Sequence, residues 1–164
     1  MKITKAIAIA FLSVLFTPAI LANSLIPKEL IGKWYYHGSM IEGTPELIQF
    51  NPTDTATIET VTFDIIYDSG TRHPTQISCI ERQDVKIDSV KNENKTTIIL
   101  DGKITKVEVL AAGPGSTVHD CNSPFRTNLV GVTNHFILTN VKTFTSFDID
   151  YGNGVVHTYK HRNH

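Results

Sequence analysis

Short strand-like runs follow one another along almost the whole chain after about residue 30, and they constrain the fold more than any other feature. Apolar or β-branched residues alternate with polar ones in these runs, which is the period of a half-buried strand, and no helical pattern of useful length occurs. The runs cover residues 32–40, 46–50, 55–67, 76–80, 84–90, 95–100, 104–110, 130–138, 142–149 and 155–162. The pattern predicts an all-β domain of about eight to ten antiparallel strands.

Turn residues separate these runs. Asp101-Gly102, between Ile98-Ile99-Leu100 and Ile104, gives the clearest predicted hairpin. Residues 111–128, which contain Gly113-Pro114-Gly115, predict one long loop. Further turn signals lie at residues 51–54, 68–70, 92–94 and 152–154. Antiparallel strands in one unit must hide their edges, which a closed barrel does completely, although a two-sheet sandwich fits the strand count equally well.

Residues 1–22 have the organisation of a removable signal peptide. Two lysines give a positive start, residues 6–16 form an apolar run, and small residues follow near Ala22. The apolar run is too short for a membrane span. We predict cleavage after Ala22, with Ala19 as the alternative site, and a domain of residues 23–164 that is periplasmic or secreted.

The two cysteines are predicted to form a Cys79–Cys121 disulfide, because exported chains with an even cysteine count usually pair them in an oxidising compartment. Reactive or metal-binding thiols are the alternative interpretation, but the sequence contains no Cys-x-x-Cys. Removal of the leader takes away two basic residues and leaves the 16 acidic residues three in excess. No basic stripe is present, which argues against nucleic acid and against anionic membrane surfaces as partners.

Two short motifs make the chain resemble a known class of proteins. Leu30-Ile31-Gly32-Lys33-Trp34-Tyr35-Tyr36 places the only tryptophan in a Gly-x-Trp at the start of the strand-rich region. Residues 50–58, Phe-Asn-Pro-Thr-Asp-Thr-Ala-Thr-Ile, are similar to the strand-turn-strand signature of small bacterial lipocalin-like domains. The resemblance implies an antiparallel, up-and-down lipocalin-like β-barrel of about 8–10 strands over residues 23–164.

In lipocalin-like barrels the Gly-x-Trp strand begins at the closed end, and a basic residue near the last strand packs over the indole. The resemblance therefore implies structural roles for Gly32 and Trp34, with Lys160 or Arg162 as the basic partner. A core aromatic without this role is the alternative for Trp34. The large side chains available to line the interior and bind a ligand include Phe63, Ile65, Tyr67, Phe136, Phe144 and Phe147.

No residue set identifies a reaction or a cofactor. Gly-x-Ser-x-Gly, His-Glu-x-x-His and phosphate-binding glycine loops do not occur, so we name no catalytic residue, and an enzyme is the minority interpretation. His157 and His161 would lie about 13 Å apart on one strand, too far to share a metal by themselves. A site there would need a third partner from a neighbouring strand, such as His37 or His135, and surface histidines are the favoured interpretation, so we name no metal site and no cofactor.

The sequence favours an exported protein that binds a small apolar or amphipathic molecule in a barrel cavity. The alternative belongs to another class of function. It is a periplasmic interaction module, such as an inhibitor or immunity-type protein, that binds an envelope protein through its surface loops. The loop of residues 111–128 offers His119, Asp120, Phe125 and Arg126 for such contacts.

Overall fold

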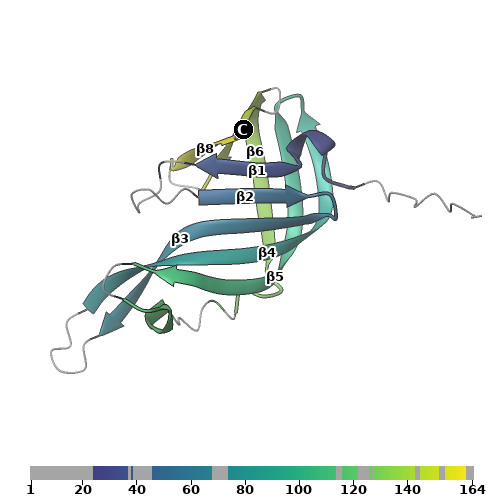
Figure 1. Ribbon diagram of the computed structural model, residues 1–164. Coiled ribbons are helices and arrows are strands. Elements are labelled where there is room, and N and C mark those ends of the chain that lie inside the picture. Colours follow the sequence, from purple (N-terminus) through teal and green to yellow (C-terminus); the bar gives the residue numbers. More distant parts are fainter. Residues whose placement is uncertain are drawn as a thin grey trace, which may run out of the picture.

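Eight antiparallel strands form a closed barrel in the computed structural model, in which each strand pairs with its neighbour in the chain and the first pairs with the last (Figure 1). The structure describes residues 24–36, 38, 46–67, 74–113, 116–121, 126, 128–142, 145–151 and 154–161, and the strands are counted within these. The strands are β1 (Gly32–Tyr36), β2 (Glu46–Asn51), β3 (Thr55–Tyr67), β4 (Pro74–Asn94), β5 (Thr97–Ala112), β6 (Thr133–Lys142), β7 (Ser146–Asp150) and β8 (Val156–His161). Two short 3-10 helices accompany them, η1 (Lys28–Leu30) and η2 (Val118–Cys121). The predicted all-β, up-and-down barrel is confirmed, and the two-sheet sandwich is not formed.

Side-chain alternation along the strands builds the core. Every second residue points inward, and the inward positions carry the large apolar side chains, such as Ile48 and Phe50 on β2 or Phe136 and Leu138 on β6. Complete burial of each such side chain stabilises the fold by about 1.5–3 kcal/mol. The predicted leader, residues 1–22, lies outside the described residues.

One end of the barrel is closed by Trp34 and η1. The Trp34 side chain is fully buried, and its Nε1–H donates a hydrogen bond of 2.8 Å to the carbonyl oxygen of Leu30. Ile26 and Leu30 are buried with it, while the rings of Phe147 and His161 lie 4.8 and 5.0 Å from the Trp34 ring. The short helix therefore forms a lid whose backbone is held by the indole that it covers.

The predicted hairpin at Asp101-Gly102 is wrong. These residues lie inside β5, and the connection between β4 and β5 is instead the turn at Lys95 and Thr96. The pairing of β4 with β5 shifts register between Ile87 and Ser89, opposite Gly102. A Cβ at Gly102 would lie 2.5 Å from the carbonyl oxygen of Lys86, so glycine is needed here for close approach at a β-bulge and not for a turn.

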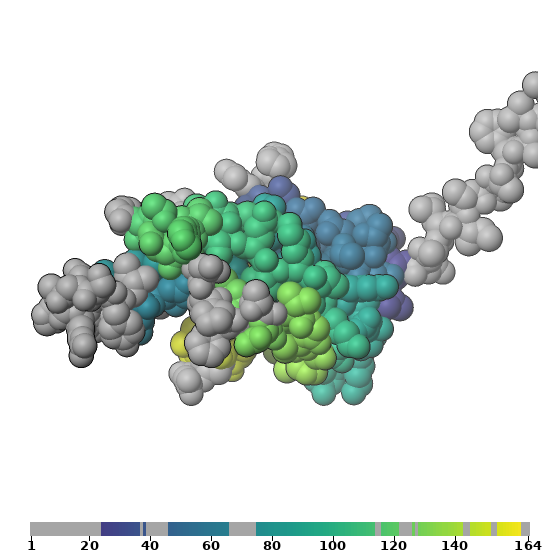
Figure 2. Space-filling view, turned by 90° about the horizontal axis from the view of Figure 1, so that it is seen from below, coloured from purple at the N-terminus to yellow at the C-terminus, as the bar shows by residue number. Residues whose placement is uncertain are grey.

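Two long strands therefore replace four predicted short ones, and they carry the sheet beyond the barrel. β2 pairs with β3 as far as Glu59, and β6 pairs with β5 as far as Lys103. Beyond these points β3, β4 and β5 continue as a ribbon, which projects toward the lower left of Figure 1. In the space-filling view the green residues that follow β5 lie at this projecting end of the molecule (Figure 2).

The connection between β5 and β6 folds back onto this ribbon. η2 packs against β3, β4 and β5, and the predicted disulfide between Cys79 and Cys121 is present, with both residues fully buried. The bridge closes a segment with a sequence separation of 42. A cross-link that closes a loop of this length lowers the entropy of the unfolded chain, and by this effect alone it stabilises the fold by about 4 kcal/mol. The predicted long loop is thus fastened near its middle to the strand that carries Cys79.

Candidate functional site

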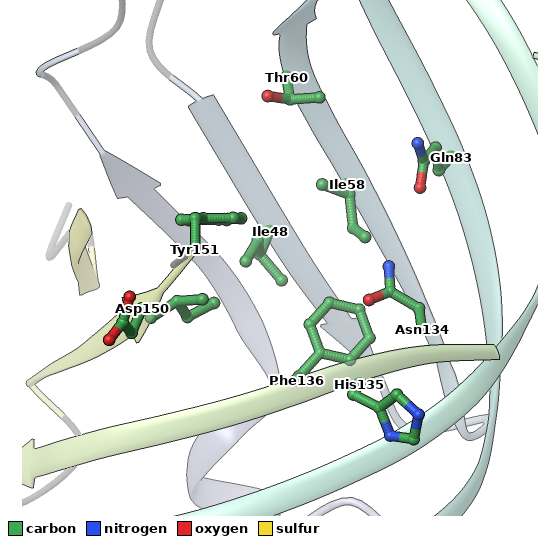
Figure 3. A pocket seen from close by; sticks show the side chains of 10 residues that line it. Ile48, Ile58, Thr60, Gln83, Asn134, His135, Phe136, Asp150 and Tyr151 are labelled. Atoms are coloured by element: carbon green, nitrogen blue, oxygen red, sulfur yellow. The ribbon is translucent and has the colours of Figure 1, made fainter. Parts of the chain in front are cut away.

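A hollow of about 220 Å³ occupies the open end of the barrel, opposite Trp34. Figure 3 shows its lining side chains, which come from β2, β3, β4, β6 and β7 and from Tyr151, just after β7. The apolar lining residues are Ile48, Ile58, Phe136 and Ile149, and the polar ones are Thr60, Gln83, Asn134, His135, Asp150 and Tyr151.

The floor of the hollow is the point at which the barrel interior becomes filled. The ring centroids of Phe136 and Phe50 are 6.1 Å apart, and those of Phe50 and Phe147 are 6.4 Å apart. Phe147 in turn packs on Trp34. The interior of an eight-stranded barrel is just large enough to be filled by side chains or to hold one small ligand. In this barrel, side chains fill the closed end, and space for a small molecule remains at the open end. The apolar floor can receive a hydrocarbon group, while the polar residues lie nearer the rim.

The polar residues follow from the same alternation as the core. Thr60 lies two residues beyond Ile58, Gln83 two before Val85, and Asn134 two before Phe136. Each therefore faces inward, but at a level where the strands approach the opening. Sequence reasoning missed these residues because it selected large apolar side chains, although extending the inward positions of each strand toward its open end would have found them.

A buried carboxylate lies in the barrel wall beside the hollow. The Oε2 atom of Glu46 lies 3.2 Å from both the Tyr159 hydroxyl, which donates to it, and the Nδ1 atom of His157. The hydroxyls of Tyr151 and Tyr159 are 2.8 Å apart, so Tyr151, a lining residue, is linked through Tyr159 to Glu46. The His157 ring stacks on Tyr36 at 3.9 Å and lies 4.8 Å from Tyr151. This network fixes the side of the opening formed by β1, β2 and β8.

The Tyr159 hydroxyl gives the barrel a predicted alkaline sensitivity. Burial raises the pKa of Tyr159 far above its ordinary value of 10.0, and Tyr151 and Glu46 add to the effect. The contribution of this hydroxyl to the free energy of unfolding is fully present below pH 10. It falls as the pH rises toward the folded-state pKa, because in that range the hydroxyl ionises only in the unfolded chain. The expected loss is about 1.4 kcal/mol of unfolding free energy per pH unit.

Urea denaturation of the wild type and Tyr159→Phe between about pH 8 and 11 tests this expectation. The variant should begin less stable by about 1–2 kcal/mol, because Glu46 loses a hydrogen bond, but its stability should decline less steeply with pH. Parallel declines in the two proteins would contradict the assignment to Tyr159.

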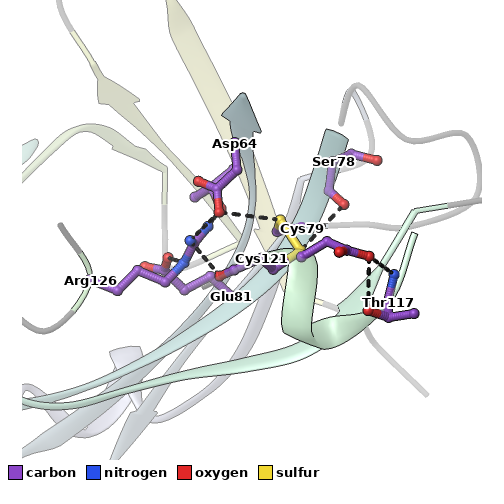
Figure 4. Close-up of a disulfide and its surroundings, with 9 residues drawn as sticks. Asp64, Ser78, Cys79, Glu81, Thr117, Cys121 and Arg126 are labelled. Atoms are coloured by element: carbon purple, nitrogen blue, oxygen red, sulfur yellow. Dashed lines mark hydrogen bonds and ion pairs between the residues drawn. A yellow bond between two sulfur atoms is a disulfide. The ribbon is translucent and has the colours of Figure 1, made fainter. Parts of the chain in front are cut away.

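A second polar cluster fastens the β5–β6 connection to the ribbon (Figure 4). Arg126 donates from Nε to Glu81 at 2.8 Å, from Nη1 to Asp64 at 2.6 Å and to the carbonyl oxygen of Cys121 at 2.7 Å, and from Nη2 to Thr62 at 2.9 Å. Glu81 is 2% exposed and Arg126 is 9% exposed. The cluster lies beside a more open hollow of about 250 Å³ that shares Gln83 with the first. Because all three guanidinium nitrogens already donate hydrogen bonds within the protein, we interpret Arg126 as a structural residue that holds the β5–β6 connection against the ribbon.

The structure places the predicted ligand-binding residues in different regions. Phe136 lines the hollow, whereas Phe147 lies in the filled part of the barrel. Phe63 and Ile65 belong to the ribbon and are 41% and 61% exposed, because their positions in the alternation are opposite to those of Thr62 and Asp64, which face Arg126. Tyr67 is the last residue of β3, opposite Pro74, and Phe144 lies outside the described residues. Ligand binding by these residues stays a prediction.

Of the predicted structural residues, Gly32, Trp34 and Lys160 lie on β1 and β8 toward the closed end, apart from the cysteines. Gly32 begins β1 with a φ of 135°, and a Cβ there would lie 2.8 Å from the His161 ring. Lys160 is exposed and lies opposite Tyr35, while its neighbour His161 lies opposite Trp34 and meets the indole edge-on. Arg162 lies outside the described residues, so its contact with Trp34 stays a prediction.

Within the residues that the structure describes, no helix has the length and apolar character needed to cross a membrane. Across the same residues, no three His, Cys, Asp or Glu side chains are grouped so that they could hold a metal ion. Comparison with known proteins shows no relative, since no protein-family model, curated protein or solved structure matches the chain.

Proposed function

We propose that this protein is an exported binding protein that holds one small apolar or amphipathic molecule in the open end of its barrel. The observation that carries the proposal is the half-filled interior, in which Trp34 and Phe147 fill one end and a hollow of about 220 Å³ remains at the other. Ligand sites are typically concave, mostly apolar and provided with a few polar groups, and they measure about 300–1,000 Å³. The smaller hollow suits a correspondingly small ligand.

Export and family are parts of the same proposal. The signal-peptide pattern of residues 1–22 and the Cys79–Cys121 bridge both suit a periplasmic or secreted protein, because disulfides persist in oxidising compartments. The closed eight-stranded barrel and the buried Trp34 of the Gly-x-Trp strand support a lipocalin-like assignment. A small molecule outside the cytoplasm is what such a protein would carry or capture.

A matched pair of substitutions on β3 tests the site. Thr60 lines the hollow and Val61, its neighbour, points the opposite way along the strand. Hexan-1-ol, followed through the NMR signals of Ile58 and Ile149, should bind the wild type and Val61→Trp alike. Binding to Thr60→Trp should weaken at least about tenfold, because an indole would occupy the hollow. Failure of hexan-1-ol and related short amphipaths to shift these signals in the wild type would overturn the proposal.

Native mass spectrometry of the protein purified from its own compartment gives a second, independent readout. A bound small molecule that is retained by Val61→Trp and absent from Thr60→Trp would support the proposal.

The second candidate function, an interaction module for an envelope protein, is favoured by the exposure of Phe63 and Ile65 on one face of the ribbon. A monomer without a small molecule, together with a protein partner that Phe63→Ser/Ile65→Ser loses and Thr60→Trp retains, would favour this function over ligand binding.

A further inference from the structure

The orientation of the Gln83 amide determines what this residue offers to the hollow. Its Nε2–H donates a hydrogen bond of 2.7 Å to Oε1 of Glu81, whose other oxygen accepts from Nε of Arg126 at 2.8 Å. The Glu81 carboxylate is therefore the acceptor in both bonds, and Gln83 must use its nitrogen as the donor. Its carbonyl oxygen, an acceptor, remains for the hollow. In Figure 3 this oxygen lies on the side of the Gln83 side chain nearer to Asn134.

Nothing within the described residues donates to that oxygen. Asn134 and Thr60, which also line the hollow and are only partly buried, likewise have no side-chain hydrogen-bond partner among the described residues. These three side chains contribute two amides and a hydroxyl, all uncharged. Unpaired polar groups in a partly closed apolar site favour a ligand that completes their hydrogen bonds.

Carboxylates outnumber cations around the hollow. Asp150 is among its lining residues, Glu81 accepts from the lining residue Gln83, and Glu46 is linked to Tyr151 through Tyr159. The Arg126 cation beside Gln83 is already shared by Glu81 and Asp64. None of the lining residues is lysine or arginine. The Nδ1 atom of the lining residue His135 lies 2.7 Å from the Asp101 carboxylate, so this imidazole already has a partner within the protein. A ligand carboxylate would lose its hydration without gaining a cation.

We infer that the ligand is a short amphipath with a neutral or cationic head that donates a hydrogen bond, such as an alcohol, an amide or an amine, and that it is not a carboxylate. The inference rests on the proposed function and names the ligand class of the same hollow. The hydrocarbon part packs on Ile58 and Phe136, and the head donates to the Gln83 carbonyl oxygen at the level of the rim.

Four probes of similar size separate the head groups. Hexan-1-ol donates and accepts, its isomer 1-methoxypentane only accepts, hexylammonium is a cationic donor, and hexanoate is anionic. We expect hexan-1-ol to bind about threefold to tenfold more tightly than the ether, as one neutral hydrogen bond implies. Hexylammonium should bind at least as tightly as the alcohol, and hexanoate at least about tenfold more weakly. Dissociation constants come from NMR titration of the wild-type protein at neutral pH.

A variant pair assigns the selectivity to Gln83. Gln83→Met keeps the length of the side chain but removes the acceptor, so it should remove the preference for the alcohol over the ether while the ether still binds. Gln76→Met is the control, because Gln76 lies on the same strand, exposed on the ribbon and outside the lining, and its variant should keep the preference.

The outcomes distinguish the two levels of the proposal. Equal binding of alcohol and ether, or tightest binding of hexanoate, would overturn the inference and leave the binding function standing. Absence of binding by all four probes would overturn the proposed function together with the inference. Unchanged selectivity in Gln83→Met would overturn the role of Gln83 even if that variant is less stable, because the comparison between probes is made within one protein.

Discussion

Replacement of Trp34 by alanine will destabilise the protein by about 3–5 kcal/mol, the range for loss of a large aromatic side chain from a packed core. The indole is fully buried and packs against the rings of Phe147 and His161. Its N–H donates a hydrogen bond to the carbonyl oxygen of Leu30, and this bond ties the η1 lid to β1. The substitution therefore removes apolar contacts, opens a cavity at the closed end and leaves the Leu30 carbonyl without its donor.

Urea denaturation measures this effect, and two further variants separate its parts. Trp34→Phe keeps an aromatic ring but loses the hydrogen bond, so its cost should lie below that of alanine. Lys33→Ala, next to Trp34 on β1 and exposed, should change the stability by no more than about 0.5 kcal/mol. Because Trp34 is the only tryptophan, its fluorescence is an independent check. Emission typical of water, readily quenched by iodide in the folded protein, would contradict the burial.

Strand alternation was sufficient to predict the all-β fold, because burial on one face is a local property of each strand, whereas the choice of a barrel over a sandwich rested on the resemblance carried by the Gly32-Lys33-Trp34 and 50–58 motifs. Ile48 and Phe50 on β2, or Phe136 and Leu138 on β6, show the inward period directly in the sequence. The same period places Phe63 and Ile65 opposite to Thr62, yet their size suggested an interior position. Hydrophobicity identified these two residues as candidates, while their position in the alternation determined the face on which they lie.

The sequence-based predictions were wrong or incomplete at residues whose role is set by contacts with distant segments of the chain. Asp101-Gly102 has the composition of a hairpin turn, but the glycine is required by the close approach of the Lys86 carbonyl across β4 and β5, which no local pattern reveals. Likewise, Gln83 becomes an acceptor only because Glu81 and Arg126 fix its amide, and Arg126 lies 45 residues from Glu81 in sequence. Polar site residues are defined by their partners, and these partners come from distant segments.

Loss of the Arg126 charge is the other substitution with a large expected effect. Arg126→Met should destabilise the protein by about 3–5 kcal/mol, because the buried carboxylate of Glu81 and the partly buried carboxylate of Asp64 would lose their cation. Arg82→Met is a matched control. Arg82 donates from Nε to Glu59 at 2.9 Å, but its side chain is 39% exposed, so that pair should be worth no more than about 1 kcal/mol.

A triple variant decides whether charge or packing causes the loss. Replacement of the whole cluster by apolar side chains, Arg126→Met with Glu81→Met and Asp64→Leu, should recover most of the stability, because no unpaired charge then remains buried. Urea denaturation of the single, control and triple variants under oxidising conditions keeps the Cys79–Cys121 bridge constant. A cost for Arg126→Met no greater than that for Arg82→Met would show that the disulfide alone holds the β5–β6 connection on the ribbon. A large cost that the triple variant relieves would show that the buried arginine holds the connection there together with the bridge.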